Sequence, residues 1–111
     1  MASVLRGEIR SAELDPTCGN EQQGTRPVLI ISHDVFNERS GTVLAMVITS
    51  KPQRAGFPLT LPLGKLGGKQ AWLKISQVTV LSTKRLGRKL GKGTAEQLAQ
   101  AIDGLNEIVG G

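Results

Sequence analysis

DPTCGNEQQGTRPVLII, residues 15–31, carries a long polar loop directly into the first strongly apolar run of the chain. The loop contains two glycines that permit positive φ, and a proline stands near each of its ends. A connection of this length inside a small domain is more often functional than idle. The apolar run, residues 28–31, is typical of a strand buried on both faces. We therefore expect a core strand that begins at the edge of a functional loop.

The loop places a carboxylate and a guanidinium, Glu21 and Arg26, close together in the sequence. Arg26 precedes Pro27, which biases it towards an extended conformation at the mouth of the strand. Its planar fork of donors suits phosphate oxygens. The alternative is that Glu21 and Arg26 form an ion pair that only orders the loop.

Strand candidates flank this run on both sides. Residues 8–14 are a weak candidate, whereas residues 43–48 are nearly all apolar. The second candidate ends abruptly at Thr49 and Ser50, which predicts hydroxyl groups at the end of a core strand. Residues 33–37 indicate a short helical turn or a loop.

The second half of the chain predicts more strands and a final helix. Residues 57–63 alternate strictly between apolar and other side chains, but two prolines confine them to a sheet edge. Residues 64–69 form a glycine-rich turn, and residues 71–75 and 78–81 make one long strand or two short ones. A capping-box sequence at Thr94 starts a helix with one apolar face, made of Leu98, Ile102, Leu105 and Val109.

These elements predict a mainly β fold, a small barrel-like antiparallel sheet with one C-terminal α-helix. Residues 1–111 fit a single domain, because a chain of this length buries roughly two-thirds of its unfolded surface. No apolar run approaches the roughly 20 residues that span a bilayer, and no signal-peptide core is present. A single cysteine also fits a reducing interior. We expect a cytoplasmic protein with no membrane partner.

The net charge favours an anionic partner without proving one. Fourteen Lys and Arg against nine Asp and Glu give a formal charge of +5, which also occurs in proteins that merely stay soluble. The densest basic cluster consists of Lys84, Arg85, Arg88, Lys89 and Lys92. Most such clusters are solvated faces, but beside a nucleic-acid groove one would concentrate a polyanion. Neither glycine–lysine pair has the spacing of a nucleotide-binding P-loop.

Short sequence motifs are spread over nearly the whole chain, and the most specific is the core Glu21-Gln22-x-Gly24-x-Arg26-Pro27. The others are Arg6–Ile9, Asp15–Pro16, Phe36–Asn37, Val47–Ser50, Ile75–Val78 and Lys84–Leu86. In these motifs the chain resembles the MazF/PemK family of toxin endoribonucleases. It departs from the family at Arg10–Ser11, where aromatic residues are frequent, and at Ser76, where an aspartate is usual. His33 matches no catalytic position of the family.

The resemblance implies the SH3-like barrel of the MazF/PemK/CcdB-like toxins and sequence-specific cleavage of single-stranded mRNA, which stops translation and growth. It also implies a homodimer and neutralisation by a cognate antitoxin with an acidic tail. Carried over residue by residue, it makes Arg26 and Thr49 catalytic. Four further residues are assigned to substrate binding: Glu21, Gln22, Ser50 and Gln77.

The sequence predicts chemistry without a metal or a cofactor, because it has one histidine, one cysteine and no ligand cluster. RNA can be cut by its own 2′-hydroxyl, which attacks the adjacent phosphorus. The resemblance implies a cyclic phosphate and a 5′-hydroxyl as the products. Two alternatives are a gyrase-poisoning toxin of the same fold and a catalytically silent RNA-binding regulator. The pair Arg26 and Thr49 argues against the first, and an RNA-cleavage assay separates the second.

We predict that RNA cleavage persists in excess EDTA, because the nucleophile belongs to the substrate and needs no metal-bound water. A substrate with a 2′-deoxy sugar at the scission site should resist cutting in the same assay. Loss of activity on chelation, restored by magnesium or manganese, would contradict this mechanism.

Overall fold

The computed structural model describes residues 3–14 and 24–110. Their order along the chain is β1 (Glu8–Leu14), β2 (Gly24–Ile30), α1 (Asp34–Ser40), β3 (Thr42–Thr49), β4 (Thr60–Leu66), β5 (Lys69–Ser82), the 3₁₀ turn η1 (Thr83–Arg85), β6 (Leu86–Lys92) and α2 (Ala95–Ile108). Within these residues no helix has the length and apolar character needed to cross a bilayer.

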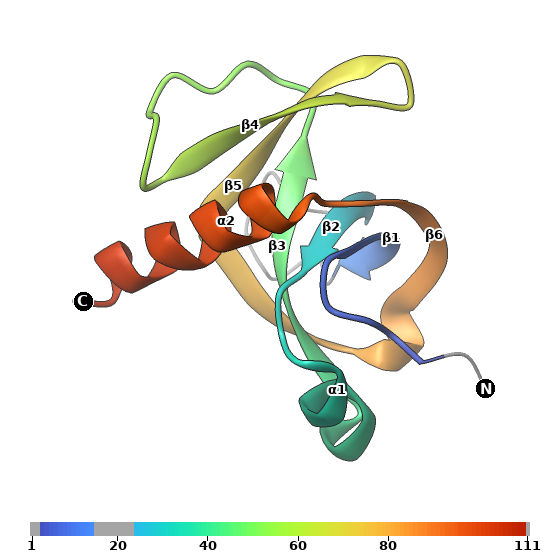
Figure 1. Cartoon of the computed structure of the whole chain (residues 1–111). Helices are drawn as coiled ribbons and strands as arrows, with labels where there is room; N and C mark the ends of the chain where they lie inside the picture. Colours follow the sequence, from blue (N-terminus) through green and yellow to red (C-terminus); the bar gives the residue numbers. More distant parts are fainter. Residues whose placement is uncertain (1–2, 15–23, 111) are drawn as a thin grey trace.

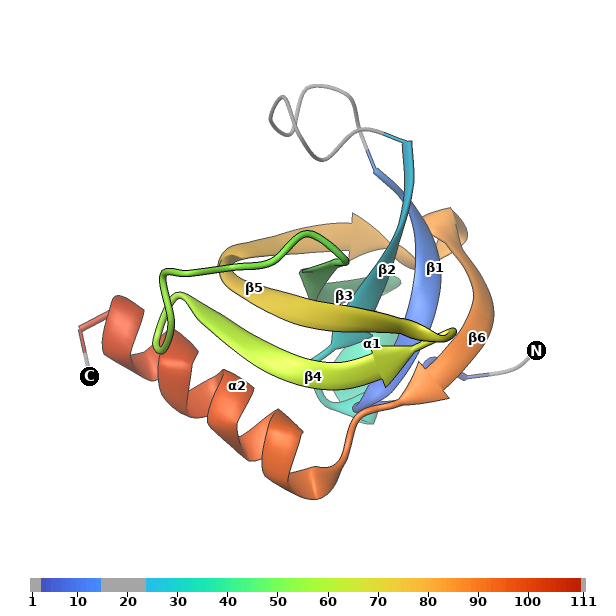
Figure 2. The same ribbon diagram turned by 90° about the horizontal axis from the view of Figure 1, so that it is seen from above.

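The strands form one antiparallel sheet in the order β4-β5-β3-β2-β1-β6. The sheet curls into a half-barrel, and α2 lies across one of its faces (Figure 1, Figure 2). The predicted mainly β fold with a C-terminal helix is therefore confirmed. Pro58 and Pro62 were predicted to confine their strand to a sheet edge. This is also confirmed, since β4 is an outer strand.

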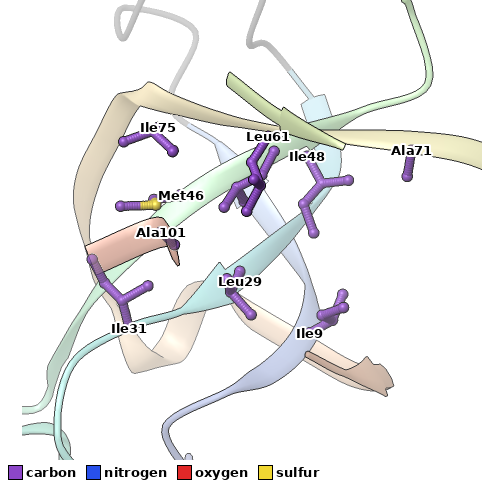
Figure 3. Close-up of a cluster of buried hydrophobic side chains, with 10 residues drawn as sticks. Ile9, Leu29, Ile31, Met46, Ile48, Leu61, Ala71, Ile75 and Ala101 are labelled. Carbon is purple, nitrogen blue, oxygen red and sulfur yellow. The ribbon is translucent and has the colours of Figure 1, made fainter. Parts of the chain in front are cut away.

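Each face of the sheet carries its own core. The helix-side core lies beneath α2 (Figure 3) and contains Ile9, Leu29, Ile31, Met46, Ile48, Leu61, Ala71, Leu73, Ile75 and Ala101. The far-side core contains Ala12, Leu14, Val28, Ile30, Val43, Ala45, Val47 and Leu81. Because successive side chains of a strand point to opposite faces, β2 and β3 supply both cores. This explains their unbroken apolar runs and confirms the strand buried on both faces.

The capping box predicted for α2 is present. The Thr94 hydroxyl accepts a hydrogen bond from the Gln97 backbone N–H at 3.0 Å, and the Gln97 side-chain oxygen accepts one from the Thr94 N–H at 3.0 Å. The Gln97 amide nitrogen also donates to the Leu63 carbonyl at 3.0 Å, which ties the start of the helix to β4. The apolar face differs from the prediction at its end, since Val109 is 72% exposed.

Strand boundaries in the second half differ from the prediction. The strand expected over residues 57–63 begins only at Thr60, and Phe57 and Leu59 are exposed. A register shift near Gly64, where φ is +80°, lets β4 continue to Leu66. The predicted glycine-rich turn shrinks accordingly to two residues. β5 is one long strand. Its pairing with β3 has a register shift at residues 75–77, between the pairs Val47–Lys74 and Met46–Val78.

We predict that Gly104→Ala lowers the free energy of unfolding by about 1–3 kcal/mol. A Cβ at this buried position would lie 2.7 Å from Ile75 Cδ1 and 3.1 Å from the Pro58 carbonyl oxygen. This overlap outweighs the gain in helix propensity, which is at most about 1 kcal/mol. Chemical denaturation measures the change.

The matched control is Ala99→Gly on the exposed side of α2, which isolates the propensity term. A Gly104→Ala protein that unfolds at the wild-type denaturant concentration or higher would contradict the close packing of α2 on the sheet.

Candidate functional site

Strand register brings the predicted catalytic residues to one face of the sheet. Val28 of β2 pairs with Val47 of β3, which in turn pairs with Lys74 of β5. Arg26 lies two residues before Val28, and Thr49 lies two residues after Val47. Because the side-chain period of a strand is two, all of these side chains stand on the face of the far-side core. Antiparallel pairing also places the start of β2 beside the end of β3.

A pocket of about 410 Å³ opens at this end of the sheet. Its described lining consists of Arg26, Pro27, Ile48, Thr49, Ser50, Lys51, Gln53, Leu66, Lys69, Gln70, Ala71 and Lys74. Three of the six residues that the sequence assigned to the site, namely Arg26, Thr49 and Ser50, therefore lie around one cavity. They come from the start of β2 and the exit of β3.

Thr49 is the last residue of β3, and its side chain is half-buried. Its hydroxyl oxygen accepts a hydrogen bond from the Lys51 backbone N–H at 3.2 Å. The Gln53 amide nitrogen donates to the Lys51 carbonyl at 3.0 Å, which closes the loop after the strand. A hydroxyl that accepts one hydrogen bond still has its own proton to donate. The Thr49 hydroxyl at the pocket wall therefore keeps a proton available for a further hydrogen bond.

The pocket is strongly cationic. Its described lining carries Arg26, Lys51, Lys69 and Lys74 and contains no aspartate or glutamate. Arg26 is exposed, and its backbone is held opposite Ala12 of β1. Such a cluster of donors and positive charge suits the oxygens of a phosphate group.

The remaining predicted residues are not part of the described pocket. Gln77 is half-buried in the irregular part of β5 and does not line the cavity. Glu21 and Gln22 lie outside the described residues. His33 is exposed just before α1, beyond the end of β2, whereas Arg26 lies near its start.

Sequence reasoning missed the three lysines and two glutamines of the pocket, which are Lys51, Lys69, Lys74, Gln53 and Gln70. One signal was present, because Lys74 interrupts an otherwise apolar strand. The others sit in or beside turns, where polar residues are ordinary. Their approach to Arg26 depends on strand pairing that a sequence pattern does not contain.

A buried carboxylate holds the basic edge strand beside β1. Glu8 is 5% exposed and accepts hydrogen bonds from the Leu5 N–H at 3.0 Å and from Arg10 Nε at 3.1 Å. Lys89 Nζ of β6 lies 3.8 Å from the other Glu8 oxygen, and Arg10 also donates to the Gly87 carbonyl at 3.1 Å. Arg10 therefore joins β1 to β6.

The basic cluster of residues 84–92 lies on η1 and β6, and none of its five cations lines the pocket. β1 separates β6 from β2 and Arg26. Arg85 donates to the Glu13 carbonyl at 3.4 Å, while Lys84, Arg88, Lys89 and Lys92 are exposed. The cluster therefore lies at the outer edge of the sheet, one strand away from β2 and outside the described pocket lining.

A family model describing PemK-like, MazF-like toxins of type II toxin–antitoxin systems matches residues 5–109. The chain belongs to this family. The match confirms the resemblance carried by the Glu-Gln-x-Gly-x-Arg-Pro core and covers both strands that supply Arg26 and Thr49.

Solved structures of MazF toxins and of an endoribonuclease share the fold over nearly their whole length. MazF from Deinococcus radiodurans is 25% identical, with a TM-score of 0.84 and coverage of 100% of both chains. An endoribonuclease from mycobacterial species, in complex with its cognate antitoxin, is 22% identical, with a TM-score of 0.78 and coverage of 97% of this chain and 96% of that chain. A MazE–MazF structure from D. radiodurans is 22% identical, with a TM-score of 0.78 and coverage of 99% and 98%. The expected MazF/PemK-like barrel is confirmed.

Proposed function

We propose that this toxin is a sequence-specific, metal-independent endoribonuclease that cleaves single-stranded mRNA in the cytoplasm. The observation that carries the proposal is the pocket in which Arg26 of β2 and Thr49 of β3 meet, among three lysines and with no described carboxylate in its lining. A phosphodiester has the charge and the acceptor oxygens that this lining would bind.

In the proposed reaction the RNA supplies the nucleophile. The 2′-oxygen bonds to the adjacent phosphorus as the bond to the 5′-oxygen breaks, which yields a 2′,3′-cyclic phosphate and a 5′-hydroxyl. One proton leaves the 2′-hydroxyl, and one arrives on the departing 5′-oxygen. The protein's contribution is to orient the groups and stabilise the charge on the phosphorane oxygens.

Arg26 and Thr49 have distinct roles in this reaction. The Arg26 guanidinium stabilises the developing negative charge with paired N–H donors. Thr49, whose oxygen already accepts a hydrogen bond from the Lys51 N–H, donates a hydrogen bond from its hydroxyl to the same phosphate. Ser50 binds the substrate at the pocket wall, while Glu21, Gln22 and Gln77 remain proposed contacts of the RNA outside the described lining.

A cognate antitoxin and a second copy of the chain complete the proposal. Relatives of the same fold are seen with MazE or with a cognate antitoxin. An acidic, initially disordered segment of the antitoxin would fold over the cationic surface and compete with RNA for it. A homodimer would double the +5 charge of each chain and so strengthen attraction for both ligands.

Arg26→Ala and Thr49→Val should each lower the single-turnover rate of RNA cleavage by about 10²–10³-fold, the usual cost of one donor to a developing oxyanion. Arg26→Lys should recover only a small part, because an ammonium cannot reproduce the paired donors. Gel analysis of a defined RNA at saturating protein measures the rate.

The matched control is Arg39→Ala, which removes an exposed arginine from the last turn of α1, outside the pocket lining. It should cut at the wild-type rate. Circular dichroism should report an unchanged fold for every variant. Cleavage by Arg26→Ala at the wild-type rate would overturn the proposed mechanism.

Neutralising Lys84, Arg85, Arg88 and Lys89 together to glutamine should slow association with both RNA and an acidic antitoxin peptide by about tenfold at low salt. The difference should shrink at high salt, where the charges are screened. RNA and antitoxin binding should also be mutually exclusive. Stopped-flow association at two salt concentrations measures these rates.

The single-turnover rate on bound RNA serves as the internal control for this variant, because none of the four residues lines the pocket. Association rates equal to those of the wild type would identify the cluster as a solvated face only.

A further inference from the structure

Lys74 occupies an unusual place for a lysine. It lies in β5, an inner strand of the sheet, and pairs with Val47 of β3 on one side and Thr60 of β4 on the other. Its side chain is half-buried. A lysine can cover such a site with its aliphatic stem and keep its ammonium in water. Here the available opening is the pocket of Arg26 and Thr49, whose lining includes Lys74.

Lys74 lies two residues further along the strands, away from the pocket end of the sheet, than the proposed catalytic pair. Trp72, two residues earlier on β5, is the partner of Thr49, whereas Lys74 belongs to the row of Val28 and Val47. β3 also separates it from β2 and Arg26. The backbone positions of Lys74 and Arg26 are therefore roughly 10 Å apart across the strands and roughly 7 Å apart along them.

Arg26 and Thr49 stand in one row of the sheet and Lys74 stands in the next, so a phosphate held by the first row would leave Lys74 to meet a neighbouring phosphate of the same RNA strand. We propose that Lys74 binds the phosphate next to the scissile one, and so fixes the register of the RNA strand in the pocket. The inference rests on the proposed function, because it takes Arg26 and Thr49 to mark the scissile phosphate.

Two features favour Lys74 over the other pocket lysines for this role. Lys51 and Lys69 are exposed, in the loop after β3 and at the first position of β5. Lys74 is half-buried between two neighbouring strands, which limits the rotamers that its stem can adopt. A cation ordered before binding loses less conformational freedom when it meets its phosphate. Its contribution should appear in RNA affinity, with little effect on the chemical step.

The test uses Lys74→Met, which keeps an unbranched apolar stem and removes the charge, and an uncleavable RNA with a 2′-deoxy sugar at the scission site. We expect RNA affinity to fall about tenfold at low salt and the slope of log K against log salt to fall by roughly 0.7, the value for one phosphate of a single strand. Lys74→Arg should keep the wild-type slope. Lys65→Met, an exposed lysine on β4 outside the pocket lining, is the matched control.

A set of RNAs with one neutral methylphosphonate linkage each then locates the contact. In the wild type, neutralising one linkage beside the scissile phosphate should weaken binding about tenfold. In Lys74→Met the same change should have almost no further effect, while other linkages keep theirs. Such coupling between one side chain and one linkage is a direct sign of contact.

If the losses of RNA affinity caused by Lys74→Met and by the neutral linkage were fully additive, the proposal would be overturned. A large fall in the cleavage rate of bound RNA with unchanged affinity would overturn it as well. Because Lys74→Arg keeps the charge, a reduced slope of log K against log salt in that variant would also contradict the proposal. The proposed function fails separately: a wild type that cuts no RNA contradicts the nuclease, whereas a wild type that cuts RNA without the coupling contradicts only the role of Lys74. A wild type that neither cuts nor binds RNA overturns both.

Discussion

The pairing of β2 with β3 and of β3 with β5 is the constraint on which both the fold and the pocket depend. Val28, Val47 and Lys74 share one row of the sheet, and the two cores fix that row because each face accepts only its own apolar set. A slip of one residue would turn every side chain of a strand to the opposite face. Arg26 or Thr49 would then point towards the helix side, so packing and site geometry cannot change independently.

Much of the fold follows from local patterns in the chain. The apolar runs of β2 and β3 and the capping box at Thr94 identify their elements because burial and hydrogen bonding act there over short distances. The start of β4 was not predictable, since residues 57–59 alternate correctly but β5 leaves its regular ladder at residues 75–77. Arg26 and Thr49 were predicted from a family pattern, whereas Lys74 and Gln70 of β5 join the site only through the pairing of distant strands.

Glu8 explains why part of the positive charge of the chain is structural. A carboxylate that is only 5% exposed needs partners to offset its desolvation, and the Leu5 N–H, Arg10 and Lys89 provide them. Glu8 and these partners anchor the outer strand β6 to β1. The pairing of these two strands is irregular there, because its register shifts twice. Arg10, a departure from the family pattern, thereby has a packing role, and Lys89 is shared between the fold and the basic surface.

The concentration of four cations around one pocket has an evolutionary consequence. Like charges that face no carboxylate in the described lining repel one another whenever the pocket is empty, although solvent screens the three that are exposed, Arg26, Lys51 and Lys69. Replacing any of these residues by a neutral one relieves the repulsion. If the proposed nuclease activity harms the cell that makes it, a neutral substitution at one of these positions would relieve both the toxicity and the repulsion. Under the proposed function, selection for survival and selection for stability would therefore favour the same substitutions.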